Sequence, residues 1–261
     1  MCKGSNAVCI LLVGLVVSVV GCPTLAAGAY VDFYNGEYLL STPATKSRPP
    51  LRLPPEEGKA ILERLLNPAH MMMTNLGEAG NATLRIGDDT RAALFALFGP
   101  AKRLPDWRKC AHDYGYISSR PGDSTVVVVR MDNPCLGNED YVSGFLVCFS
   151  PMVLSKEYRP YLQHFVPSKG IHARLATQSG LKLGMTREEV EAVLGKPLWK
   201  TKNSYEYGAL GAIQLSPEFL VTRWHWPKDV ESKPGGVDHM IDVWFVGGRV
   251  SCFEVRKLYD L

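Results

Sequence analysis

The sequence predicts an α+β fold made of two tandem modules, each with short helices packed on an antiparallel meander of three or four strands. Two observations lead to this prediction. One helix motif occurs twice, about a hundred residues apart, and each copy is followed by short runs of β-branched and aromatic residues that are typical of strands. A single repeat of that period indicates a duplicated domain and not a solenoid.

The first 22 residues are organised like a signal peptide. Lys3 precedes a nearly unbroken apolar run from Ala7 to Val20, which is too short to span a bilayer but suits a signal-peptide core. Val19-Val20-Gly21-Cys22 resembles a bacterial lipobox, in which Cys22 is acylated and becomes the new N-terminus. Ala27-Gly28-Ala29 offers an alternative A-x-A site that would release a secreted protein, and an uncleaved anchor is a third interpretation. The lipobox predicts a membrane-anchored envelope protein that faces the periplasm.

Residues 23–55 are predicted to form a proline-rich tether, with an irregular segment wrapped on the protein as the alternative. The prolines responsible are Pro43, Pro49, Pro50, Pro54 and Pro55. The first module is expected over residues 56–150 and begins with an amphipathic helix from Glu56 to Leu66, which Asn67-Pro68 ends. Residues 151–170 form a linker, and the second module covers residues 171–261.

The repeated motif runs from Leu84 to Pro100 and again from Leu181 to Pro197, with one extra aspartate in the first copy. In the second copy Thr186 and Glu189 have the spacing of a capping box, which predicts that a helix begins there. An apolar stripe follows, and Gly195 ends the helix. The physics of a capped helix explains most of this motif, so by itself it indicates a fold and not a chemistry.

Strands are expected after each helix. In the first module they cover approximately His112–Ser118, Thr125–Met131 and Tyr141–Phe149. In the second module they cover Ser204–Tyr207, Phe219–Trp226, Met240–Val246 and Arg249–Lys257, with Gly247-Gly248 as a hairpin turn. Two further echoes support the repeat: Tyr114-Gly115 with Tyr207-Gly208, and Val142 to Val147 with Val250 to Val255.

The stretch from Gly184 to Pro197 and the meander after it resemble the SmpA/OmlA (BamE-like) outer-membrane lipoprotein family. The tandem arrangement is similar to the β-lactamase inhibitory protein type. Both resemblances imply helices on an antiparallel sheet, no cofactor, and function by contact with another protein. The first implies a role in outer-membrane protein assembly or envelope integrity, and the second implies an inhibitor that places its open sheet faces on a target enzyme.

Several function classes lack support in the sequence. The formal net charge is +3 and there is no dense run of lysine and arginine, so a nucleic-acid partner is not expected. No cofactor, metal or nucleophile motif occurs, and the six histidines are scattered singly. His112-Asp113 would point to opposite faces of a strand. The protein is therefore expected not to be an enzyme; a hydrolase with a site assembled from scattered residues is the alternative.

Four cysteines remain beyond the signal and lipobox, an even number that suggests disulfides in an oxidising compartment. Cys110 opens a strand of the first meander, and Cys135 lies just past the far end of the neighbouring strand. A Cys110–Cys135 bridge is the prediction, which leaves Cys148 and Cys252 free or joined across the modules.

The last strands predict a protein-binding surface. Ile241, Val243 and Phe245 alternate toward the helices, so Asp242 and Trp244 face the other way. The same alternation places Glu254 and Arg256 on that open face. A tryptophan among charged residues is typical of a binding hot spot. Trp224 and Trp226 share one face of their own strand and are further candidates.

Overall fold

The computed structural model describes residues 30–34, 37–41, 51–105, 111–132, 140–154, 158–200, 202–212 and 236–259. Helices and mainly antiparallel strands confirm the α+β class. The described α-helices are α1 (Pro55–Leu65), α2 (Arg91–Phe98) and α3 (Arg187–Leu194), and the 3-10 helices are η2 (Pro68–Met71), η3 (Pro151–Val153) and η4 (Arg159–His164).

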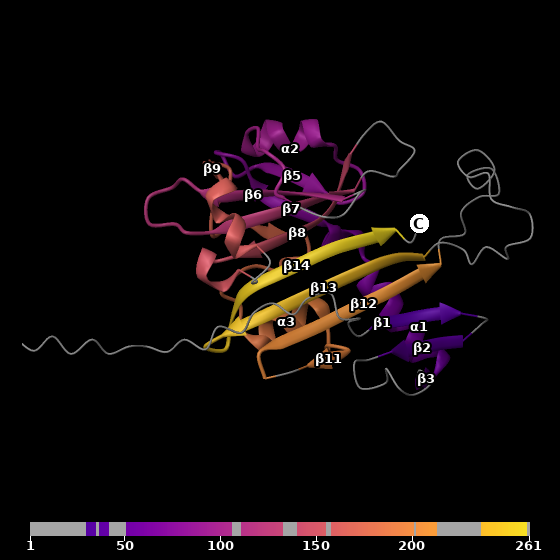
Figure 1. The fold of residues 1–261 in the computed structure, drawn as a ribbon. Coiled ribbons are helices and arrows are strands. Elements are labelled where there is room, and N and C mark those ends of the chain that lie inside the picture. The colour runs from indigo at the N-terminus through magenta and orange to yellow at the C-terminus, as the bar shows by residue number, and fades with distance from the viewer. Residues whose placement is uncertain are drawn as a thin grey trace, which may run out of the picture.

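A large twisted sheet runs through the molecule (Figure 1). Its strands are β1 (Tyr30–Tyr34), β2 (Glu37–Ser41), β3 (Leu51–Leu53), β6 (Ala111–Ser118), β7 (Val126–Asp132), β8 (Tyr141–Cys148), β9 (Val166–Ser168), β11 (Trp199–Lys200), β12 (Ser204–Ala212), β13 (Gly236–Val246) and β14 (Arg249–Tyr259). They follow the order β3-β2-β1-β12-β13-β14-β8-β7-β6-β9, with β11 paired to β12. Two pairs, β1–β12 and β6–β9, are parallel. A smaller sheet has the order β10-β4-β5, formed by β4 (Met72–Leu76), β5 (Ala82–Arg85) and β10 (Ala176–Thr177).

The capping box at the start of α3 is confirmed. The Thr186 hydroxyl accepts a hydrogen bond from the Glu189 N–H at 3.3 Å, and the Glu189 carboxylate accepts one from the Thr186 N–H at 2.7 Å. Helix α2 begins after Thr90 without a side-chain cap. Ala93 stands where α3 has Glu189, so the carboxylate half of a capping box is missing in α2.

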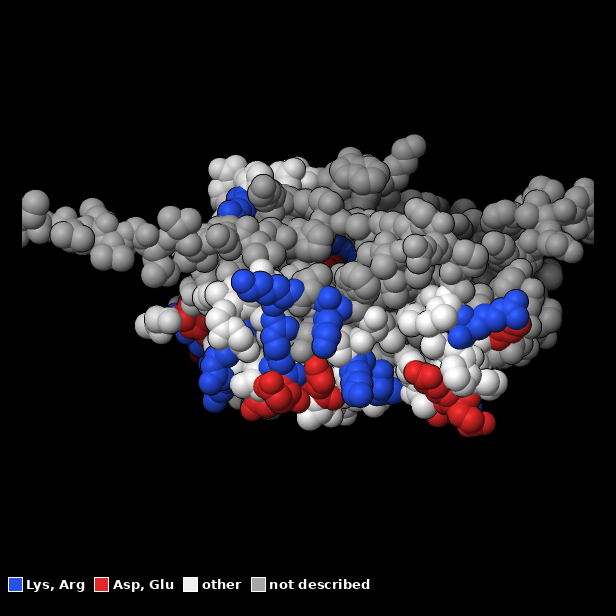
Figure 2. All heavy atoms as spheres, turned by 90° about the horizontal axis from the view of Figure 1, so that it is seen from below, with Lys and Arg blue, Asp and Glu red and all other residues white. Residues whose placement is uncertain are grey.

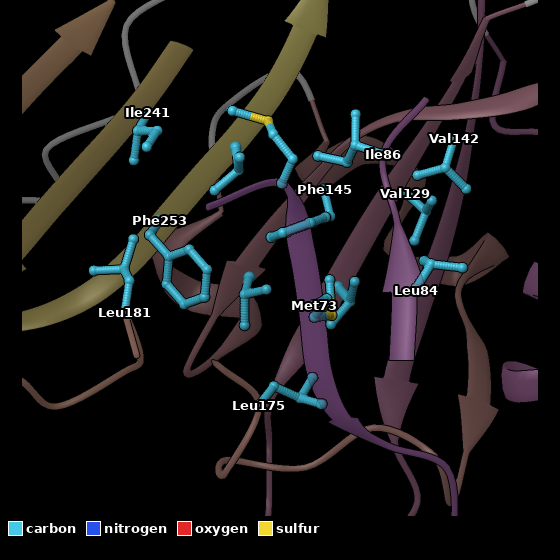
Figure 3. Packing of buried hydrophobic residues seen from close by; sticks show 14 of the residues in the cluster. Met73, Leu84, Ile86, Val129, Val142, Phe145, Leu175, Leu181, Ile241 and Phe253 are labelled. Atoms are coloured by element: carbon cyan, nitrogen blue, oxygen red, sulfur yellow. The ribbon is translucent and has the colours of Figure 1, made fainter. Parts of the chain in front are cut away.

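The main core lies between the large sheet and a layer formed by the three α-helices and the smaller sheet. Phe145 of β8 and Phe253 of β14 meet edge to face, with ring centroids 6.4 Å apart. Met73 of the smaller sheet packs in the same cluster, as Figure 3 shows. Side chains from both predicted modules therefore share one continuous core.

The loop before each repeated helix makes the same pair of backbone hydrogen bonds to the start of a later strand. The bonds lie at corresponding positions of the repeated sequences. They are Gly87 N–H to Val142 O (2.7 Å), Val142 N–H to Asp89 O (2.8 Å), Gly184 N–H to Val250 O (2.8 Å) and Val250 N–H to Met185 O (2.8 Å).

The β7–β8 and β13–β14 ladders each contain a bulge, directly after Arg130 and directly after Trp244. Counted from these bulges, Tyr114 corresponds to Tyr205, because Tyr114 pairs with Val129, one residue before Arg130, and Tyr205 pairs with Val243, one residue before Trp244. The predicted echo of Tyr114-Gly115 in Tyr207-Gly208 is therefore wrong by two residues. Tyrosines two apart share a face of a strand, which is why the sequence alone does not separate the two registers.

The segment predicted as a tether contains strands of the large sheet. β1 pairs with β12 through Val31↔Ala209 and Asp32↔Leu210, and β2 and β3 extend the sheet beyond it. The tether interpretation is therefore wrong for these strands, because their backbone groups are used in the sheet. Helix α1, expected to open the first module, packs near β12, β1 and β2, beside strands of the second.

Candidate functional site

Four of the predicted binding residues lie on the face of the large sheet opposite the main core, which we call the outer face. Alternation along β13 and β14 places Trp244, Asp242, Glu254 and Arg256 there, as expected. The side of the sheet was thus predictable from the sequence. Whether that side is open is a separate matter.

Trp244 is buried, with 8% of its surface exposed. It belongs to a second apolar cluster on the outer face, together with Leu146 of β8 and Cys252 of β14. The cover comes from the segment predicted as a linker, which contributes Leu154 and Phe165 around η3 and η4. The expectation that Trp244 stands exposed among charges is corrected by this cover.

A network of charged side chains lies beside this cluster, in the middle of the outer face. Arg130 of β7 forms ion pairs with Asp113 of β6 at 3.4 Å and with Glu254 of β14 at 3.7 Å. Arg256 pairs with Asp242 at 3.6 Å. The network thus ties four strands together, and little of these side chains reaches solvent.

Tyr158, from the segment over the outer face, closes the network. Its hydroxyl donates to Asp113 at 2.8 Å and accepts from Arg130 at 3.1 Å. Burial raises the pKa of Tyr158, and the neighbouring Asp113 carboxylate raises it further. Burial lowers the pKa of Arg130, but Glu254, Tyr158 and Asp113 outweigh that effect and raise it. Arg130 therefore stays positively charged and Tyr158 stays neutral, and their bonds with each other and with Asp113 hold the segment that carries Tyr158 against the sheet.

Gly144 makes room for the network between Arg130 and Arg256, its two neighbours across the sheet. A Cβ at this position would lie 2.9 Å from the Arg256 Cβ and 2.9 Å from the Val255 carbonyl oxygen. Those atoms belong to a packed strand and cannot move away cheaply. Gly144→Ala should therefore lower the free energy of unfolding by about 1–3 kcal/mol in a urea titration. An unchanged midpoint would contradict the packing of β8 against β14.

The described cysteines form one bridge, Cys148–Cys252, which joins β8 to β14. This is the alternative in which the two cysteines are joined across the modules. Cys110 and Cys135, predicted to pair, lie outside the described residues, as do Cys22, Trp224 and Trp226.

Three members of the network were not predicted from the sequence: Asp113, Arg130 and Tyr158. Arg130 carried a signal, because it interrupts a strand whose other members from Val126 to Met131 are apolar. A charge in such a strand indicates a buried ion pair. Tyr158 carried no comparable signal, since it lies in a segment without periodicity.

Two histidines, His70 of η2 and His239 of β13, lie close to the place where η2 packs against β14. The His70 Nε2 contacts the Arg64 carbonyl oxygen at 3.0 Å, so this nitrogen carries the proton and Nδ1 accepts from the Ser179 hydroxyl at 2.7 Å. Burial lowers the pKa of His70 and, with help from Lys257, lowers the pKa of His239 to about 4. Both side chains are therefore neutral in the folded protein at neutral pH.

This pair predicts acid sensitivity. The folded pKa values lie below 6.5, so the unfolded chain binds protons first as the pH falls. Stability should be full above pH 6.5 and should decline between pH 6.5 and about 4. Thermal melts across this range measure the effect, and His239→Gln should flatten the curve. His164→Gln, at an exposed position, is the control; a similar flattening there would contradict the assignment.

Charges of both signs are mixed on the face seen in Figure 2. Within the described residues, no group of three histidine, cysteine or acidic side chains is placed to hold a metal ion. In the same part of the chain, no helix has both the length and the apolar character needed to cross a membrane.

Comparison with known proteins gives no relative: no family model, curated protein or solved structure matches the chain.

Proposed function

We propose that the chain is an exported cell-envelope lipoprotein, anchored through Cys22, that works by binding another protein. The observation that carries the proposal is the recurrence of one helix-to-strand unit in the two parts of the chain. That unit is the one for which the sequence resembles the SmpA/OmlA (BamE-like) family, whose members act by protein contact.

Corresponding contacts in the two copies support the tandem arrangement. Isolated bridges join Thr90 to Tyr141 and Thr186 to Arg249, at corresponding positions of the two copies. The paired hydrogen bonds before each helix and the bulge in each ladder also correspond. Independent folds would not be expected to agree in such details, so these features support two related modules.

The pairing of β8 with β14, which we call the seam between the modules, also supports two related modules. Gly144 pairs with Arg256, and Cys148 pairs with Cys252. The sequence echo makes Gly144 the counterpart of Cys252 and Cys148 the counterpart of Arg256. If the two modules are exchanged, the Gly144–Arg256 pair therefore takes the place of the Cys252–Cys148 pair. This is the pattern expected of an approximate twofold axis that passes near Leu146.

The disulfide and the N-terminal sequence support export. The Cys148–Cys252 bridge is a structural disulfide between two central strands, and such bridges persist in oxidising compartments outside the cytoplasm. It agrees with the apolar N-terminal run and the lipobox at Cys22. A periplasm-facing protein without a catalytic motif fits a binding role, with envelope assembly favoured over inhibition because of the lipobox.

The test is co-purification after cross-linking in intact cells, from detergent-solubilised envelope. Recovery of barrel-assembly proteins is the expected result. Recovery of a single soluble enzyme would favour the inhibitor type, and recovery of no protein would overturn the binding role. The Cys22→Ser chain serves as the matched control, because it lacks the thiol that the anchor requires.

A further inference from the structure

The described part of the chain exposes four large apolar side chains, and three of them gather at one end of the large sheet. Their exposed fractions are 58% for Leu51, 44% for Phe149, 70% for Met152 and 46% for Val246. Val246 pairs with Arg249 at the β13–β14 turn. Phe149 donates its N–H to the Ser251 carbonyl oxygen at 3.0 Å, and Met152 follows in η3.

We call this region the hairpin end, defined by residues 149–152, 184–189, 202–203 and 245–249; its β13–β14 turn lies at the left in Figure 1. Three arginine side chains lie in or beside this region. The Arg249 guanidinium donates to the Gly184 carbonyl oxygen at 2.9 Å. Arg187 lies over the Phe245 ring, 4.3 Å from its centroid, and donates to the Lys202 carbonyl oxygen. Arg159 reaches the Met152 carbonyl oxygen at 2.6 Å.

Exposed apolar tips among arginine and lysine fit the interface of a bilayer that carries anionic lipids. The apolar groups enter the boundary of headgroups and acyl chains, and the cations contact phosphates. The acids within the hairpin end are Glu188 and Glu189, and Glu189 is already engaged in the helix cap. We propose that the hairpin end rests on an anionic lipid surface.

The path of the chain supports this orientation. β12 begins at the hairpin end, because Ser204 pairs with Trp244. β1 runs parallel to β12, so the end of β1 that carries Tyr30 is the one nearer the hairpin end. Seven residues separate Cys22 from Tyr30, a span of at most about 29 Å. This orientation rests on the proposed acylation of Cys22.

The test uses the mature chain from residue 22 with Cys22→Ser, so that only the protein surface can bind. Flotation with phosphatidylglycerol vesicles should succeed, and flotation with phosphatidylcholine vesicles should fail. Val246→Ser and Met152→Ser should each weaken binding about five- to tenfold. Arg249→Glu should weaken it further and reduce its dependence on salt. Leu51→Ser and Arg52→Glu on β3 are the matched controls and should change nothing.

Equal binding to both vesicle types, equal effects of the β3 controls, or no flotation at all would overturn the proposal. Loss of a co-purified protein by Val246→Ser, without flotation of the parent chain, would assign the surface to a protein partner instead. Thermal melts of every variant exclude unfolding as the cause. Acylation is measured separately in cells, so failure of the anchor and failure of the surface are distinguishable.

Discussion

Replacing Trp244 with alanine should lower the free energy of unfolding by about 3–5 kcal/mol. The indole is buried between β13 and the segment that carries η3 and η4, next to Cys252 and Leu146. Truncation removes its packing and leaves a cavity that the surrounding strands fill only partly. Urea denaturation at neutral pH measures the loss.

Trp244→Phe is the matched control and should retain most of the stability, because it keeps an apolar ring at the site. Leu51→Ala, at an exposed position, should change stability by less than about 0.5 kcal/mol. If Trp244→Ala melts like the parent chain, the indole stands on an open face. The interpretation of Trp244 as an exposed binding residue would then be restored.

Removing the disulfide should have an effect of similar size. Cys148 and Cys252 are separated by 104 residues, so the bridge closes a long loop and restricts the unfolded chain strongly. The double variant Cys148→Ala, Cys252→Ala should lose about 2–5 kcal/mol in thermal or urea unfolding. Alanine suits the buried site better than serine, since no hydroxyl is left without a partner.

Non-reducing peptide mapping provides the control for this prediction. A Cys148–Cys252 peptide is expected. A link between Cys110 and Cys148 would contradict the strand order at the seam, and the stability loss would then need another explanation.

The features that sequence predicted well are local. Thr186, Glu189 and Gly195 determine where α3 begins and ends through contacts within a few residues. The strands that follow are visible because their side chains alternate or are uniformly apolar. The choice of face for Trp244 was also local, since it depends only on neighbours along the strand.

The features that were missed depend on long-range contacts. Trp244 is covered by a segment around Phe165, which lies about eighty residues earlier and has no periodicity. β1 joins β12 through Val31 and Ala209, nearly 180 residues apart, by a parallel pairing that no local pattern specifies. Local composition therefore predicts a tether for the proline-rich stretch, although β1, β2 and β3 belong to the large sheet.

Metabolic labelling with a fatty-acid analogue tests the proposed lipid anchor at Cys22. Label is expected on the wild-type chain and not on Cys22→Ser, and the wild-type chain is expected in the membrane fraction. An unlabelled, soluble mature protein that begins near Gly28 or Tyr30 would contradict it, because cleavage would then have occurred at the A-x-A site.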